Sequence, residues 1–372
     1  MRANPDITVL QRGRSRGLSL VELLVAAAIG IIASLAIFQV FAVFEGQKRT
    51  TTSGGEAQTS GTLALFTVER DVRQSGYGIN TPDLVGCTLQ GWDQQTSAAL
   101  APSTLAPALI TQGAGSTPGV AGAPDSITVA YGNGDALPAP VAILVGGAPS
   151  DDFIRTVNAL YGFLPGEHVV IAEPGRPCTL AQVNLTPPGT GDNTRLNLQA
   201  GTYVSPTTGA TLNTRYNNPA GLGTAYTAAN GKVYNLGPTP TIKTFSVQNG
   251  QLMSQALGVV GATPVFDNIV QLQAQYGHDT NGDGVVDTFN ETTPVTTAGW
   301  AAVLAIRIAV VARSGLFEKD EVSPATIRLW DDSATPPTTT GPVWTLTADE
   351  RHYRYKVFQT VIPLRNMLWR PY

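Results

Sequence analysis

The sequence predicts an α+β fold, in which a long amino-terminal helix packs against an antiparallel β-sheet domain with long loop insertions. Two observations lead to this class. Residues 18–44 of the 372-residue chain form one apolar run. Residues 76–372 carry short apolar segments separated by stretches rich in glycine, proline, threonine and asparagine, a pattern typical of short strands and exterior loops.

The apolar run is long enough to cross a membrane. At about 1.5 Å per residue it makes a helix of roughly 40 Å, and Glu22 is its one ionisable residue. Because Arg12, Arg14 and Arg16 precede the run, we expect the leader to stay cytoplasmic and the bulk of the chain to lie outside. A carboxylate inside a membrane helix costs roughly 2.5–3.5 kcal/mol, so Glu22 needs a partner charge.

Gly17 lies between the basic leader and the apolar run, whereas a secretory signal peptide has its cleavage site after the apolar region. Gly17, Leu18 and Glu22 resemble the class III leader of type IV prepilins and pseudopilins, although leucine replaces the commoner phenylalanine after the cut. The resemblance implies that prepilin peptidase removes residues 1–17 and that Leu18 is N-methylated. The new amine of Leu18 would lie about one helical turn from Glu22 and neutralise it.

The second half of the helix, residues 45–75, is expected to be amphipathic. Val68 and Val72 recur at helical spacing and predict packing against a sheet, whereas the charged residues around them, Asp71 included, are expected on other faces. Gly54 and Gly55 are poor helix formers, so we expect a bend or weak point there. The domain organisation is therefore a leader (1–17), a helix (18–75) and a β-rich domain (76–372).

Nine segments of the β-rich domain read as strands, and the last three include the longest. Asn249 and Gly250 predict a type I′ hairpin turn. In the segment 301–313, alternation places Leu304, Ile306, Ile308 and Val310 on one face, which we expect to press on the helix. The expected strands are 126–131, 168–173, 178–184, 232–236, 242–247, 251–255, 269–276, 301–313 and 355–364. The polar stretches 94–125 and 186–231 read as long loop insertions.

Several segments of the chain resemble PilW-type minor pilins. They are ERDVRQSGYG (69–78), SITVAY (126–131), IRIAVVARS (306–314) and FQTVIPLRN (358–366). The resemblance implies a type IV pilin-like fold and a minor pilin at or near the tip of the type IV pilus. Its implied partners are prepilin peptidase, other minor pilins, the major pilin and a tip adhesin, and its implied roles are pilus assembly, cell adhesion and twitching motility. The resemblance also implies that the protein is first located in the bacterial inner membrane, with its domain in the periplasm, and is then incorporated into the extracellular filament.

Two alternatives stay open from the sequence. A tip pseudopilin of a type II secretion system has the same leader, helix and sheet. A membrane-anchored adhesive or carbohydrate-binding protein with an ordinary signal anchor is the second alternative, because of the threonine- and asparagine-rich insertions.

Composition argues against nucleic-acid binding and against catalysis. Once residues 1–17 are removed, 19 basic and 26 acidic residues remain, for a net charge of −7, and no basic stripe is left to track a phosphate backbone. His168, His278 and His352 are scattered along the chain, and no nucleophile elbow or phosphate-binding glycine motif is present. We therefore expect a protein that is not an enzyme and binds no nucleic acid directly.

Cys87 and Cys178 are the only two cysteines. A domain outside the cytoplasm lies in an oxidising compartment, where an even number of cysteines favours pairing. We expect one disulfide between them, with two separate buried thiols as the alternative.

The segment DTNGDGVVD, residues 279–287, predicts a Ca²⁺ site. Side-chain oxygens alternate along it, the glycine at 284 permits a sharp turn, and the expected ligands are Asp279, Asn281, Asp283, the carbonyl of Val285, and Asp287. An EF-hand would need a bidentate glutamate where this chain has an asparagine at position 290, so closure by Asp287 is expected instead, with Glu291 able to assist. The alternative is an acidic turn without a metal.

Overall fold

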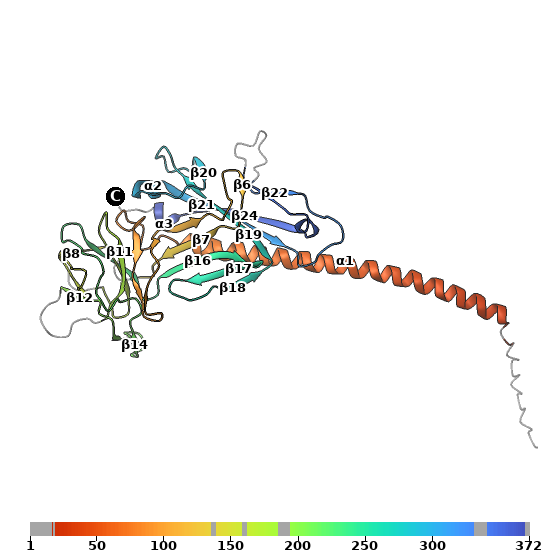
Figure 1. Cartoon of the computed structure of the whole chain (residues 1–372), viewed down its shortest axis with the longest axis horizontal. Coiled ribbons are helices and arrows are strands. Elements are labelled where there is room, and N and C mark those ends of the chain that lie inside the picture. Colours follow the sequence, from red (N-terminus) through yellow and green to blue (C-terminus); the bar gives the residue numbers. More distant parts are fainter. Residues whose placement is uncertain are drawn as a thin grey trace, which may run out of the picture. The chain divides into compact units, whose positions relative to one another are not determined.

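The structure is a computed structural model, and it describes residues 17, 19–134, 139–157, 162–184, 194–330 and 341–368. The predicted α+β class is confirmed, because helix α1 (Leu20–Gln74) is followed by a mostly antiparallel β domain (Figure 1). The chain divides into two compact units, residues 1–53 and 54–372. The β-rich unit therefore begins within α1, and the last part of the helix belongs to it.

Helix α1 is continuous through Gly54 and Gly55, so the chain stays helical at the weak point expected there. A glycine costs only about 1 kcal/mol in a helix, and the helix carries both. By length and composition α1 is able to cross a membrane, and its most apolar 18-residue window has a mean hydropathy of 2.5 with none of its residues buried.

Two sheets share one core with the end of α1. In the described part of the chain, the four-stranded sheet has the order β20 (Thr288–Asn290), β19 (Ile269–His278), β21 (Val303–Arg313), β24 (Tyr355–Pro363). The five-stranded sheet has the order β18 (Thr263–Asp267), β17 (Gln251–Ala256), β16 (Thr241–Gln248), β7 (Ser126–Tyr131), β5 (Ala108–Thr111). Ala64, Val68 and Val72 of α1 lie in the same apolar cluster as Ile306 and Ile308 of β21. The helix therefore packs where the alternating pattern placed it.

Strand β21 is buried on both faces, whereas packing against the helix alone would bury only one face. Ala309 and Val311 point into a second cluster with Leu329 and Trp330. This cluster is covered by the three-stranded sheet of β22 (Thr326–Arg328), β23 (Val343–Thr345) and β6 (Val120–Ala121) among the described residues. The core of this region is therefore layered on both sides of β21.

A third large sheet is built from the middle of the chain. In the residues described, its eight strands have the order β12 (Arg195–Asn197), β9 (Phe153–Thr156), β8 (Val141–Val145), β15 (Lys232–Gly237), β10 (His168–Ala172), β11 (Cys178–Gln182), β1 (Thr88–Gln90), β4 (Ser103–Thr104). Alternate residues of β10 enter two different cores, with Val170 in one and Val169 and Ile171 in the other. Both faces of this sheet are therefore covered.

The stretches expected to be loops contain strands. Residues 94–125 include β4, β5 and β6, and the described part of 186–231 includes β12. The strands missed are mostly two to four residues long and rich in alanine, threonine and asparagine, so no alternating pattern marks them. The remaining elements are β2 (Trp92–Asp93), β3 (Ala98–Ala99), β13 (Thr202–Val204), β14 (Thr211–Asn213), α2 (Thr297–Ala301), a 3₁₀ turn (Glu350–His352) and α3 (Arg365–Leu368).

The hairpin turn between β16 and β17 has the predicted geometry. Asn249 has φ of 52° and Gly250 has φ of 75°, which is the pair of left-handed conformations that a type I′ turn needs. The turn sets the antiparallel register in which Gln248 faces Gln251.

Candidate functional site

The proposed processing junction lies at the start of α1. Gly17 is exposed, and no atom lies within 4 Å of the position that a Cβ would take. Leu18 falls outside the described residues. Glu22 is exposed in the first turn of the helix, where unpaired backbone N–H groups favour a negative charge. No ion pair of Glu22 is formed within the described residues.

The 279–287 segment connects β19 and β20 as an exposed loop that folds around its own acidic side chains. Asp279 accepts backbone N–H groups from Gly282 at 2.6 Å and from Gly284 at 2.8 Å. Asp287 accepts both the backbone N–H and the hydroxyl of Thr280 at 2.7 Å. These donors stabilise the ionised form and lower the pKa of both carboxyls, chiefly through Gly284 for Asp279 and the Thr280 hydroxyl for Asp287.

The two middle side chains of this loop also turn inward. Asn281 donates from Nδ2 to Asp283 at 3.2 Å and to Asp287 at 3.4 Å, and Asp283 accepts the N–H of Val285 at 2.8 Å. Glu291 does not join them, because it accepts a hydrogen bond from Gln275 at 2.9 Å. The loop therefore gathers Asp279, Asn281, Asp283 and Asp287, whereas the assistance expected from Glu291 is absent from this described arrangement.

The fit of this loop to a cation depends on those side chains moving closer together. In the part of the chain that the structure describes, no group of three or more His, Cys, Asp or Glu side chains is arranged to hold a metal ion. Asp279 Oδ2 and Asp283 Oδ1 each accept one N–H and retain a second lone pair, whereas Asp287 Oδ2 already accepts two hydrogen bonds from Thr280. Carboxylate and amide oxygens of this kind are chemically suited to calcium. The present geometry is that of a hydrogen-bonded acidic turn.

The two cysteines, Cys87 and Cys178, form a disulfide with 6.0 Å between their Cα atoms. It joins the segment after α1 to β11, beside the parallel pairing of Leu89 with Cys178. A closed loop of about 90 residues removes substantial entropy from the unfolded chain. The bond therefore attaches the eight-stranded sheet to the chain that leaves the helix.

The described residues contain five buried carboxylates that were not predicted from the sequence, and three of them, Asp71, Asp93 and Asp125, join distant segments of the chain. Asp125 accepts the N–H groups of Gly113 at 2.8 Å and Ala274 at 2.9 Å, which fastens its segment to β19, and burial raises its pKa to about 6. Asp71 was expected on an outer face of α1 and is instead buried and paired with Lys243 of β16. Asp71 lies three residues after Val68, so helical spacing already contained this signal.

The third of these buried carboxylates is Asp93, which pairs with Arg215 across 122 residues of sequence. Nothing in the local sequence indicates this pairing, because the two residues come from separate polar stretches. The three histidines, His168, His278 and His352, do not come together: each lies in a different part of the β domain, and among the described residues they form no joint site.

One part of the chain matches a known protein family. Residues 226–366 match the family model PilW, described as type IV pilus-assembly protein W. This span begins just before β15 and ends in α3, so it includes the four-stranded sheet and most of the five-stranded one. In comparisons with curated proteins and with solved structures, nothing matches the chain. The match supports a PilW-type pilus protein.

Proposed function

We propose that this PilW-type pilus protein is a minor pilin, incorporated at or near the tip of a type IV pilus, where it helps to initiate assembly and presents a tip adhesin. The observation that carries the proposal is the match over residues 226–366 in a chain whose first described helix is able to cross a membrane. A pilus-assembly family supports partners among other pilus components. The partners that we propose are prepilin peptidase, other minor pilins, the major pilin and the adhesin. The processes that we propose are cell adhesion and twitching motility.

The proposed route begins in the bacterial inner membrane. The peptidase cuts after Gly17, Leu18 is methylated, and the β domain lies in the periplasm before the protein enters the extracellular filament. The carboxylate of Glu22 then neutralises the amine of its own or a neighbouring subunit, because an unpaired charge in the apolar phase is costly. No step requires catalysis by this chain, which acts as a structural subunit that does not bind nucleic acid directly.

The processing step is tested by Gly17→Val. We expect full-length protein to accumulate in the inner membrane, because a β-branched side chain obstructs access to the bond between residues 17 and 18. Immunoblotting of membrane fractions measures the size of the product. Shortened protein at the normal level from this variant would exclude the class III junction.

The assembly step is tested by Glu22→Val, with Glu45→Val as a matched control on the same helix. We expect normal cleavage in both variants. Only Glu22→Val should be depleted from sheared pili, since Glu45 already pairs with Arg49 one turn away. Equal incorporation of the two variants would show that Glu22 sets no register.

A type II secretion pseudopilin would instead co-purify with secretion components from the native membrane.

For the acidic loop we propose calcium binding, supported by the inward arrangement of Asp279, Asn281, Asp283 and Asp287, with the Val285 carbonyl as a further ligand. The ion would relieve repulsion among three carboxylates and fix the β19–β20 hairpin. Saturating calcium should raise the thermal unfolding midpoint by about 5 °C. Magnesium or Asp283→Ala should abolish the rise, and Asp267→Ala, an exposed aspartate in β18, is the control. A midpoint indifferent to calcium would leave a metal-free turn.

A further inference from the structure

A groove of about 650 Å³ lies between strands of the eight-stranded sheet and strands of the five-stranded sheet. Its floor includes Gln182 of β11, and its walls come from the β13–β14 hairpin on one side and from residues 238–243 on the other. Ligand sites in proteins commonly have volumes of about 300–1,000 Å³. The groove is therefore large enough for a ligand of several rings, and it lies outside the acidic loop and the helix.

Three aromatic rings line this groove. Tyr216 and His168 pack edge to face with their centroids 5.3 Å apart, and Tyr203 enters from β13. Burial lowers the pKa of His168 to about 4, so its ring is neutral at neutral pH. Ring faces of this kind bind apolar C–H surfaces while their polar edges remain available for hydrogen bonds.

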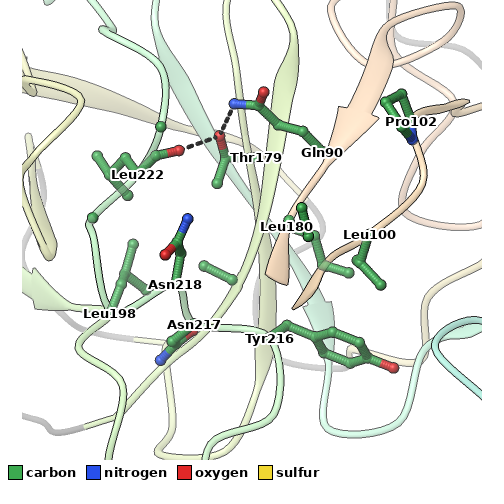
Figure 2. A pocket seen from close by; sticks show the side chains of 15 residues that line it. Gln90, Leu100, Pro102, Thr179, Leu180, Leu198, Tyr216, Asn217, Asn218 and Leu222 are labelled. Atoms are coloured by element: carbon green, nitrogen blue, oxygen red, sulfur yellow. Dashed lines mark hydrogen bonds between the residues drawn. The ribbon is translucent and has the colours of Figure 1, made fainter. Parts of the chain in front are cut away.

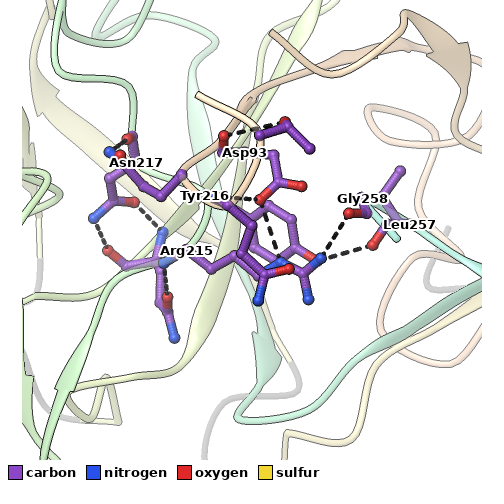
Figure 3. Close-up of polar contacts among 10 residues, drawn as sticks. Asp93, Arg215, Tyr216, Asn217, Leu257 and Gly258 are labelled. Atoms are coloured by element: carbon purple, nitrogen blue, oxygen red, sulfur yellow. Dashed lines mark hydrogen bonds and ion pairs between the residues drawn. The ribbon is translucent and has the colours of Figure 1, made fainter. Parts of the chain in front are cut away.

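The two cations of the groove are already neutralised from below. Arg215 lies 3.4 Å from Asp93 and donates to the carbonyl of Gly258 at 2.9 Å (Figure 3). Lys243 forms its ion pair with Asp71, and the side chains of both aspartates are only 2% exposed. Since each positive charge has a buried counter-charge, the groove does not select a strongly anionic ligand.

Hydrogen-bonding groups remain on the rim. Among the described residues, the hydroxyls of Tyr203 and Thr241 and the amide of Asn213 have no side-chain hydrogen-bond partner. Asn213 is exposed and the other two are partly exposed. The floor differs, because Gln182 already donates to Gly166 and accepts from Arg215, each at 2.8 Å. A ligand would therefore find its polar partners at the rim and apolar rings along the walls.

The strands beneath the groove offer no backbone edge to an extended peptide. Strands β10, β11 and β16 each have a neighbour on both sides in the described sheets, so a peptide cannot be added as a further strand there. The β13–β14 hairpin, a sheet of two strands in the described residues, is the one wall of the groove with open strand edges. A ligand on the strands beneath the groove must therefore bind through side chains, which favours one that carries its own closely spaced hydroxyl groups.

A second, smaller hollow of about 270 Å³ shares Leu180 and Tyr216 with the groove. Its polar wall is already ordered, as Figure 2 shows: Gln90 donates to the hydroxyl of Thr179, which donates to the carbonyl of Leu222, both at 3.0 Å. Tyr216 therefore stands between two hollows lined by amide, hydroxyl and apolar groups.

The Tyr216 ring is already covered by the Arg215 guanidinium, which lies 5.1 Å from its centroid. From this combination of ring faces, rim hydrogen-bonding groups and neutralised charges, we propose that the groove binds a neutral oligosaccharide, with Tyr203 as the stacking side chain. The ligand class follows because sugar rings present an apolar C–H face beside a belt of hydroxyls. The inference concerns the β domain only and does not rest on the proposed pilus role.

The test uses the full chain in lauryldimethylamine oxide, a detergent without a sugar headgroup that could compete. An array of neutral and acidic oligosaccharides is screened first, and the strongest neutral probe is then titrated by calorimetry. We expect saturable binding with a dissociation constant of about 1 mM or lower and no preference for acidic sugars. Tyr203→Ala should weaken binding about tenfold, the loss expected from one ring face.

The control for Tyr203→Ala is Tyr77→Ala, because Tyr77 is a 43% exposed tyrosine of the same unit that does not line the groove. Asn213→Ala, at the exposed end of β14, is a second groove variant that should weaken binding with little effect on folding. The proposal is overturned if no neutral oligosaccharide binds, if both groove variants bind as wild type does, or if a proline- and threonine-rich decapeptide binds while the sugars do not.

Discussion

The four-stranded sheet and the eight-stranded sheet reach burial on both faces by different routes. The four-stranded sheet has three strands of nine to eleven residues, β19, β21 and β24, that follow one another between residues 269 and 363. The eight-stranded sheet joins strands of two to six residues from 88–104 and 141–237, and includes the parallel pairing of β1 with β11. The four-stranded sheet is built mainly from long apolar strands, whereas the eight-stranded sheet combines short strands from distant parts of the chain.

The two sheets also differ in the interactions that stabilise them. The four-stranded sheet shares a large apolar cluster with α1. The eight-stranded sheet relies additionally on the Cys87–Cys178 disulfide and on buried polar pairs. One such pair imitates a strand: the side chain of Asn217 accepts from the N–H of Gln182 at 2.6 Å and donates to its carbonyl at 2.7 Å. Short strands bury little apolar area each, so covalent and polar links take a larger share.

The largest effect should come from removing the disulfide. Cys87→Ala combined with Cys178→Ala should lower the free energy of unfolding by about 2–5 kcal/mol, with the loss concentrated in the eight-stranded sheet. Hydrogen exchange should lose protection in β10 and β11 while β19 and β21 keep theirs. Equal loss of protection in both sheets would mean that the two regions unfold as one and would break the comparison.

A matched pair of substitutions in α1 tests the other region. At Gly61, a Cβ would overlap the ring of Phe358 on β24, so Gly61→Ala should destabilise this packing by about 1–3 kcal/mol. At Gly54, a Cβ meets no atom within 4 Å, and Gly54→Ala should stabilise the helix by up to about 1 kcal/mol. Chemical denaturation measures both. Changes of the same sign would show that the helix does not pack closely on β24.

A further effect is a pH dependence confined to the eight-stranded sheet. Burial lowers the pKa of His168 from 6.5 to about 4, with Arg215 adding a smaller effect in the same direction. The folded state therefore binds this proton less well than the unfolded state does. The contribution of the neutral His168 to the stability of the folded state is fully present above pH 6.5 and is lost as the pH falls toward 4.

The corresponding measurement compares wild type with His168→Gln at two pH values. Between pH 7.5 and pH 5, the wild type should lose about 2 kcal/mol more than the variant does, and the carboxyl groups common to both cancel in the difference. His352→Gln is the control, because this histidine lies outside the eight-stranded sheet. Identical pH profiles for wild type and His168→Gln would place the imidazole in a solvated setting.

Sequence reasoning succeeded where one periodicity ran over many residues. The alternation in 301–313 located β21 and its helix-facing residues Ile306 and Ile308, and Asn249 with Gly250 located a turn with the expected signs of φ. It failed for β5, β6 and β12, which are short and lie in polar stretches. It also placed Asp71 on an outer face of α1, because a charge was assumed to be exposed without its distant partner Lys243.

What the sequence determined by itself is local: an apolar run long enough for a membrane helix, alternation along the long strands, turn residues with positive φ, and a stretch of alternating oxygen side chains at 279–287. These features depend on residues a few positions apart, whose geometry follows from helix and strand periods. Only the tertiary structure decided that Asp93 meets Arg215, that Asp71 meets Lys243, and that the intervening groove is neutral. Such pairs join residues more than 120 positions apart, and the distance between them is set by the packing of whole sheets rather than by any local pattern.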